Sequence, residues 1–283
     1  GDALLELGRY DEAEAAYRKL AELGEQGTID AETRWARLAR LRGRTETARA
    51  HLETALERAR EVAAPAAIGW CSVQLGEIAF GRGEWEKAEK LYAEALEEVP
   101  DSASALDHLA ELRAAQGKYP EAIDLYGRAI ERSPRPELHQ ALGDLYAFMG
   151  KADEARPWHT RARDAYLKSV GEGRVHYYHH LAGLYADSMP DAAAALEWAK
   201  KDLELRKSVY ALDALAWALH RGGRDAEALP VMKEALAAGT EDAHLYYHAS
   251  LIASGAGDLA AGKQLLRRCV AINPRYNAFH VHR

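Results

Sequence analysis

One arrangement of small, apolar and charged positions recurs along the whole chain. In its clearest copy, Gly83 is followed by Trp85 and Ala88, with charged residues between them. Tyr92 comes nine positions after the glycine, and Pro100 ends the segment. A glycine commonly ends a helix because a left-handed backbone conformation costs it little, and a proline stops the helix that follows. The arrangement therefore predicts two helices joined by a turn at the glycine.

The turns recur at a nearly constant spacing. Met189 stands at the sixth of them and glycine at the other seven, at positions 8, 43, 83, 117, 150, 223 and 257. Five of the seven separations are 33 to 35 residues, which is the length of a helix-turn-helix repeat. A small residue stands seven positions before each turn: Gly1, Ala36, Gly76, Ala110, Gly143, Ala182, Ala216 and Ser250. Small residues there let the two helices of a repeat approach closely.

These turns divide the chain into eight repeats and a tail. The repeats are expected at about 1–29, 30–65, 69–101, 103–135, 136–170, 175–208, 209–241 and 243–275, and the tail at 276–283. The first repeat is expected to be truncated, because Gly1 falls in the middle of its first helix. Extra residues at 62–68 and 166–174 predict longer helices or a loop at two joints. Pro157 and Pro230 lie inside second helices and are expected to bend them or delay their start.

Composition indicates an all-α protein and excludes several other classes. Hydrophobic residues make up 48% of the 283 residues, too many for a disordered chain, and no alternating run marks a strand. The formal charge of −7 provides no basic field, so nucleic-acid binding is not expected. No apolar stretch is long enough for membrane insertion. Cys71 and Cys269 are too far apart in an extended array for a disulfide, which favours the cytoplasm.

The repeated residues resemble the tetratricopeptide repeat family, in its bacterial, Ala- and Arg-rich form, along essentially the whole chain. The resemblance implies a right-handed superhelical α-solenoid whose concave wall consists of the first helix of each repeat. It also implies a non-enzymatic scaffold that binds a protein or peptide in the concave groove. Fold alone is a weak guide to function, so the groove residues have to be identified one by one.

In this family the groove-facing residues stand about 13, 10, 6 and 3 positions before each turn. Carried over to this chain, these positions predict the following groove residues: Trp70, Glu77, Phe80, Asp107, Glu111, Glu137, Gln140, Asp144, His176, His179, Tyr210, Asp213, Trp217, His220 and Tyr247. The central positions hold acidic residues without Lys or Arg, and aromatic residues stand at the edges. We therefore expect an extended peptide or helix with basic and apolar side chains as the guest. The alternative is a solvated acidic face.

The twelve histidines suggest a second kind of site. Five of them stand in the runs 176–180 and 244–248, where a spacing of three or four places two rings on one helix face. Such pairs can bind zinc or another divalent metal with a third ligand from Asp213, Asp144 or Glu137. The candidate metal ligands are His176, His179, His220, His244 and His248. The alternatives are packing residues, or a groove whose His176 and His179 become charged below neutral pH.

Known catalytic patterns are missing from the sequence. It contains no GxSxG, GxxxxGK[ST], GxGxxG, HExxH or paired CxxC motif. Cys269 takes the place of a small packing residue in a second helix. We therefore expect no enzyme and no cofactor other than a divalent metal. A sensor module of a larger regulatory protein remains an alternative to the scaffold, and neither the partner nor an oligomeric state follows from the sequence.

Overall fold

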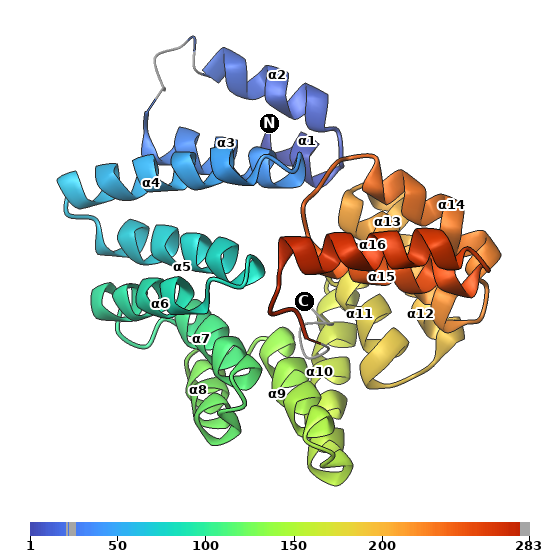
Figure 1. Cartoon of the computed structure of the whole chain (residues 1–283). Helices are drawn as coiled ribbons and strands as arrows, with labels where there is room; N and C mark the ends of the chain where they lie inside the picture. The colour runs from blue at the N-terminus through green and yellow to red at the C-terminus, as the bar shows by residue number, and fades with distance from the viewer. Residues whose placement is uncertain (21, 23–26, 278–283) are drawn as a thin grey trace.

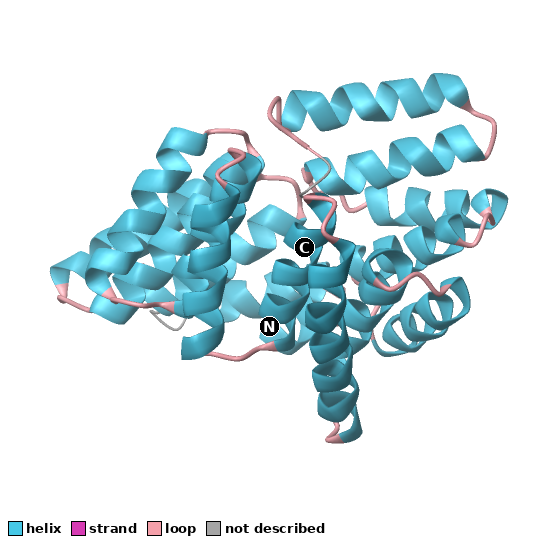
Figure 2. Ribbon diagram, turned by 90° about the horizontal axis from the view of Figure 1, so that it is seen from below, coloured by secondary structure: helices cyan, strands magenta, loops and turns pink. Residues whose placement is uncertain are grey.

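A computed structural model describes residues 1–20, 22 and 27–277, and this part of the chain is helical throughout without a strand (Figures 1 and 2). The helices form eight consecutive pairs, which confirms the predicted all-α solenoid. Their bounds are α1 Asp2–Glu6, α2 Tyr10–Leu20, α3 Ile29–Leu41, α4 Thr45–Glu61, α5 Pro65–Gly81, α6 Trp85–Glu98, α7 Ala103–Ala115, α8 Tyr119–Arg132, α9 Pro136–Phe148, α10 Ala152–Gly171, α11 Tyr178–Gly183, α12 Ala192–Leu205, α13 Val209–Arg221, α14 Asp225–Leu236, α15 Ala243–Gly255 and α16 Leu259–Ile272.

The glycine turns end the first helix of a pair in the predicted way. At the end of α3 the Gly43 N–H donates to the Arg40 carbonyl at 3.0 Å, and the Arg44 N–H donates to the Ala39 carbonyl at 2.8 Å. These bonds satisfy carbonyl groups that have no partner within the helix, and they place Gly43 at a φ of +67°.

The sixth turn has no glycine and is built differently. After α11 the chain passes through a π-helical turn at Leu184–Ser188, and the Met189 N–H donates to the Leu184 carbonyl at 2.8 Å. Asp191 then caps α12 by accepting from the Ala193 and Ala194 N–H groups. A wider turn and a side-chain cap thus take the place of the left-handed glycine.

Small residues bring the two helices of a pair together. A Cβ at Gly76 would lie 2.3 Å from the Tyr92 ring, and a Cβ at Gly143 would lie 2.3 Å from the His159 ring. Each ring therefore packs directly on the bare backbone of the neighbouring helix. Tyr92 is fully buried, as is the corresponding Tyr126 of the next pair, and His159 is 5% exposed.

The two longer joints lie beside long helices, and the two internal prolines lie within helices. The extra residues extend helices, since α4 runs to Glu61 and α10 spans 20 residues to Gly171. Pro157 and Pro230 do not delay α10 and α14, which begin five residues before them. Because proline has no N–H, the carbonyl four residues before it loses its helical hydrogen bond. In both helices this carbonyl lies in the exposed first turn, where water can take the place of the missing donor.

The array is not extended, because its first repeats contact its last ones (Figure 1). We call this contact the seam. The turn after α1 meets residues 207–208, the turn after α3 meets 239–241, and the turn after α5 meets 273–275. The Lys207 N–H donates to the Leu7 carbonyl at 3.2 Å. The Val209 N–H donates to the Tyr10 hydroxyl at 3.1 Å, and the Asn273 amide donates to the Phe80 carbonyl at 3.4 Å.

An ion-pair network reinforces the seam at its middle joint. Glu241 pairs with Arg82 of the third repeat and with Arg268 of α16, and it accepts from the Thr45 hydroxyl at 3.2 Å. The expectation of an extended array was therefore wrong, because the superhelix returns to its own start within eight repeats. Cys71 and Cys269 are nevertheless both free thiols, as predicted.

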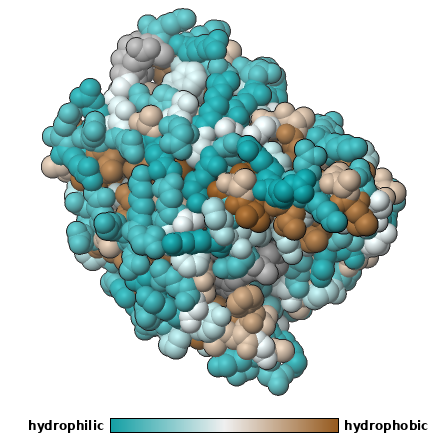
Figure 3. Space-filling view, viewed as in Figure 1, coloured by the Kyte–Doolittle hydropathy of each residue, from teal (hydrophilic) through white to brown (hydrophobic). Residues whose placement is uncertain are grey.

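The outer face of the last helix is apolar. Leu259, Leu266 and Val270 of α16 are 63%, 44% and 51% exposed, and apolar side chains gather over this helix in the space-filling view (Figure 3). Of the predicted tail, Tyr276 packs beside Tyr247 with ring centroids 5.4 Å apart, whereas 278–283 lie outside the described residues. None of the described helices combines the length and the apolar character needed to cross a membrane.

Candidate functional site

The concave side of the closed superhelix contains a pocket of about 750 Å³, which we call the interior pocket. Residues of α1 to α5 line one side of it, and residues of α11, α12 and α13 and of the segments next to them line the other. Its charged and aromatic lining consists of Asp2, Glu6, Tyr10, Tyr17, Asp30, Arg34, Arg37, Arg40, Trp70, His176, His179, His180, Asp202, Arg206 and Tyr210. Trp70 and Tyr210 remain 47% and 39% exposed although they lie on the inner wall.

Two smaller pockets adjoin the interior pocket at Tyr210, which lines all three. One, of about 150 Å³, contains Glu77, Phe80 and Glu111. The other, of about 100 Å³, contains Asp213. The inner wall therefore provides one continuous set of cavities around a single aromatic side chain.

Carboxylates outnumber guanidinium groups in these cavities by two to one. The five arginines are Arg34, Arg37, Arg40, Arg82 and Arg206. The ten carboxylates are Asp2, Glu6, Asp30, Glu77, Glu111, Asp187, Asp202, Asp213, Glu241 and Asp242. The excess of carboxylates lies in the two smaller cavities, since the interior pocket alone contains four arginines and four carboxylates, and low-dielectric walls concentrate the field of these charges.

A charge network that the sequence analysis missed moderates this field. Glu77 lies 3.1 Å from Arg40 and 3.3 Å from His108, and His108 lies 3.6 Å from Glu111. Burial alone would raise the pKa of Glu77, but His108 and Arg40 outweigh it and lower the pKa to about 2. Burial likewise disfavours charged His108, but Glu77 and Glu111 raise its pKa to about 10. His108 is therefore a cation at neutral pH.

This network predicts a defined pH dependence of stability. The folded-state pKa of His108 exceeds the value near 6.5 of an unfolded chain, so its stabilisation is complete below pH 6.5 and declines as the pH rises toward 10. In urea unfolding, the wild type should lose on the order of 5 kcal/mol of stability over this range, and His108→Gln should lack this loss. Equal pH slopes for the two proteins would show that His108 is not held as a cation.

The structure brings many of the predicted groove residues together. Those that line the three cavities are Trp70, Glu77, Phe80, Glu111, Gln140, His176, His179, Tyr210, Asp213 and Trp217. Burial lowers the pKa of His179, which moves its charging away from neutral pH.

Five predicted groove residues do not line these cavities: Asp107, Glu137, Asp144, His220 and Tyr247. Asp144 is buried and contacts His159 at 2.9 Å and Ser188 at 2.7 Å. His220 pairs with Asp225 at 2.5 Å at the end of α13. These two side chains therefore join helices rather than face a guest.

The histidine candidates also separate into two groups. His244 and His248 of α15 lie beside Asp213 of α13, and one possible ligand atom from each of the three lies within 4.8 Å of the others. His176, His179 and His220 join no such group among the described residues. The predicted third ligand Asp213 thus meets one of the two histidine runs.

Comparisons with known proteins support the repeat architecture. Three models of the tetratricopeptide repeat match the chain, one at residues 27–98 and 73–135, one at 1–25 and 243–276, and one at 211–245. The longest stretch that they leave out is 136–210, the region that contains the sixth turn without glycine.

Solved structures give a similar result at low sequence identity. A tetratricopeptide repeat protein from Parabacteroides merdae is 16% identical with a TM-score of 0.51, and the match covers 99% of this chain and 96% of that one. The pilF protein of Pseudomonas aeruginosa is 20% identical with a TM-score of 0.41, over 76% of this chain and 97% of that one. At 16% identity, the first of these matches shows the fold alone. No curated protein sequence matches the chain.

Proposed function

Because the chain belongs to the tetratricopeptide repeat family, we propose that it is a non-enzymatic scaffold that binds a short segment of a partner protein in the interior pocket. The main support is the exposure of Trp70 and Tyr210 within that pocket. Fully burying a large apolar side chain contributes about 1.5–3 kcal/mol. Aromatic anchors of this kind dominate the energetics of many interfaces. A guest that covers both rings would therefore gain substantial affinity.

The charge of the cavities supports a basic segment as the guest. Beyond Tyr210 the cavity that contains Glu77 and Glu111 also holds Asp242. A guest with an apolar side chain on Trp70 could place a Lys or Arg side chain among these carboxylates. A pocket of about 750 Å³ is in the size range of small-ligand sites. This size favours a few extended residues over a long helix.

Fluorescence anisotropy with three labelled ten-residue peptides tests this function. All three carry the same aromatic and apolar residues. The remaining positions are Lys and Arg in the basic peptide, Gln in the neutral peptide and Glu in the acidic peptide. The basic peptide should bind most tightly, and its affinity should fall as salt rises, since salt screens partly exposed charges. If no peptide binds, or if the acidic peptide binds as tightly as the basic one, the proposed function is wrong.

Removing an aromatic anchor should weaken this binding selectively. Trp70→Ala should lower the affinity for the basic peptide by about 10- to 100-fold, because it removes the apolar surface that the guest covers. Phe148→Ala is the matched control, since Phe148 is 48% exposed and does not line the three cavities. Anisotropy titrations of both variants decide the matter, and equal losses would place the binding surface elsewhere.

A further inference from the structure

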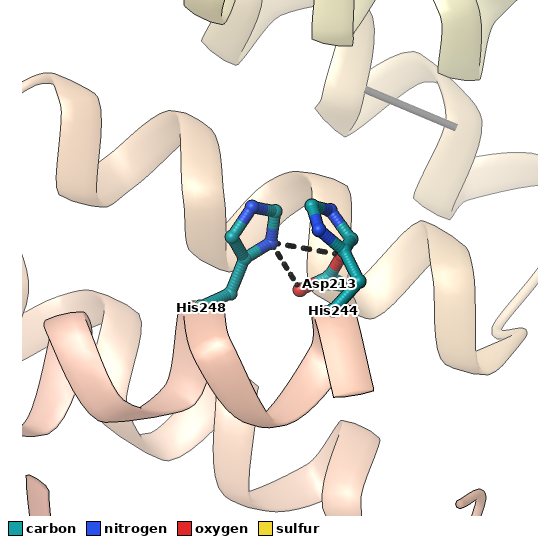
Figure 4. A group of neighbouring side chains, drawn as sticks. All are labelled: Asp213, His244 and His248. Carbon is teal, nitrogen blue, oxygen red and sulfur yellow. Dashed lines mark hydrogen bonds and ion pairs between the residues drawn. The ribbon is translucent and has the colours of Figure 1, made fainter. Parts of the chain in front are cut away.

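We propose that Asp213, His244 and His248 bind a divalent transition-metal ion such as zinc. The three side chains face one another between α13 and α15 (Figure 4). They all line the cavity of about 100 Å³ beside Tyr210. This site adjoins the aromatic surface at Tyr210 that is proposed for the partner segment. Its test measures metal binding alone, so either proposal can fail without the other.

The helices bring the three ligands into range. His244 and His248 are four residues apart on α15, so their rings project from the same face. Asp242 fixes the start of that helix by accepting from the His244 N–H at 2.8 Å. On the neighbouring helix, the Asp213 carboxylate oxygens lie 3.0 and 3.1 Å from Nδ1 of His248.

The separations suit a metal after small side-chain rotations. Zinc bonds to nitrogen and carboxylate oxygen are about 2.0–2.2 Å long, so tetrahedral ligand atoms lie roughly 3.4 Å apart. One donor atom from each residue already lies within 4.8 Å of the other two. Three protein ligands leave a fourth position for water, and a cavity of about 100 Å³ can hold both an ion and that water.

The surroundings hold the two rings in place. Trp217 stacks on His248 with centroids 3.8 Å apart and planes 8° from parallel. The Tyr276 hydroxyl lies 3.0 Å from Nδ1 of His244. Histidines that bind metals commonly have a hydrogen-bond partner on the second ring nitrogen, as His244 has in the Tyr276 hydroxyl, and this partner fixes the orientation of the ring.

The donor set selects a class of metal. Two imidazoles and a carboxylate suit zinc, cobalt, nickel or ferrous iron, whereas magnesium and calcium prefer oxygen ligands alone. Asp213 is 7% exposed and His248 is 3% exposed. A divalent cation at this position would balance the charge of the buried carboxylate.

Isothermal titration of tag-free, chelator-treated protein with ZnCl₂ tests the site, and the visible spectrum after CoCl₂ addition reports its geometry. We expect one ion per chain and a cobalt spectrum of four-coordinate type. His248→Ala and His244→Ala should each weaken zinc binding by about 100-fold or more, since each removes one of three ligands. His220→Ala is the matched control, because His220 also stacks on Trp217 but pairs with Asp225.

The His244→Ala variant keeps the test decisive if the buried pair is needed for folding. It leaves Asp213 and His248 in contact, and circular dichroism can verify that its helices are intact. Absence of zinc binding by the wild type would overturn the proposal. Undiminished binding by folded His244→Ala would overturn it as well, because the ion would then be held by other residues.

Discussion

Replacing Gly43 with alanine should lower the free energy of unfolding by about 2–5 kcal/mol and open the seam. Part of the loss comes from the backbone, because Gly43 has a φ of +67° that other residues adopt only at a cost of about 1–2 kcal/mol. The rest comes from the contact across the seam. A Cβ at Gly43 would lie 1.9 Å from the Gly239 carbonyl oxygen, and a backbone atom cannot rotate away. The two turns would therefore have to separate.

Gly117→Ala separates these two causes. Gly117 has a φ of +75°, but no described atom lies within 4 Å of the point that its Cβ would occupy. The free energy of unfolding of Gly117→Ala should therefore fall only by the backbone contribution of about 1–2 kcal/mol. Urea unfolding compares the variants, and small-angle X-ray scattering should show a larger radius of gyration for Gly43→Ala alone. Identical stabilities and radii for the two variants would mean that the turns do not touch across the seam.

Tyr92→Ala should lower the free energy of unfolding by about 3–5 kcal/mol, the cost of emptying a large aromatic site. Tyr92 is fully buried. Its ring fills the space against Gly76 and stacks on His108 with centroids 5.9 Å apart. Since the neighbouring glycine has no side chain that could move in, the cavity should persist. Urea unfolding monitored by circular dichroism measures the loss.

Tyr92→Phe is the matched control for the hydroxyl group. The Tyr92 hydroxyl is buried without a hydrogen-bond partner among the described residues. Leaving such a group buried costs free energy, so its removal should leave stability unchanged or raise it. A loss with phenylalanine comparable to that with alanine would show that a hydrogen bond, rather than ring packing, holds the pair together.

The repeat architecture was predictable because it follows from local rules applied many times. The glycine turns, the small residues seven positions earlier and the large aromatic residues nine positions later all act within one helix pair. The sixth turn shows the limit of this approach. Met189 keeps the spacing but not the conformation, and the structure replaces the glycine turn with a π-helical turn and the Asp191 cap.

The closure of the superhelix was not predictable from these rules. It results from small rotations added over many repeats, and its contacts join residues such as Thr240 and Leu41, 199 positions apart, that share no pattern. Closure also turned an expected open groove into cavities. His108 was missed because it stands beside Asp107, outside the offsets used for groove residues. The spacing of three or four residues did identify His244 and His248 as a pair, but it could not distinguish them from His176 and His179.

Photo-crosslinking from position 210 tests the central claim, that the inner wall around Tyr210 is the binding surface for a basic segment. The probe is p-benzoylphenylalanine, an aromatic residue that replaces Tyr210 in one variant and the exposed Phe148 in another. Illumination with the labelled basic peptide should give a covalent adduct at position 210 and essentially none at position 148. Equal adducts at both positions, or an adduct at position 148 alone, would contradict the account.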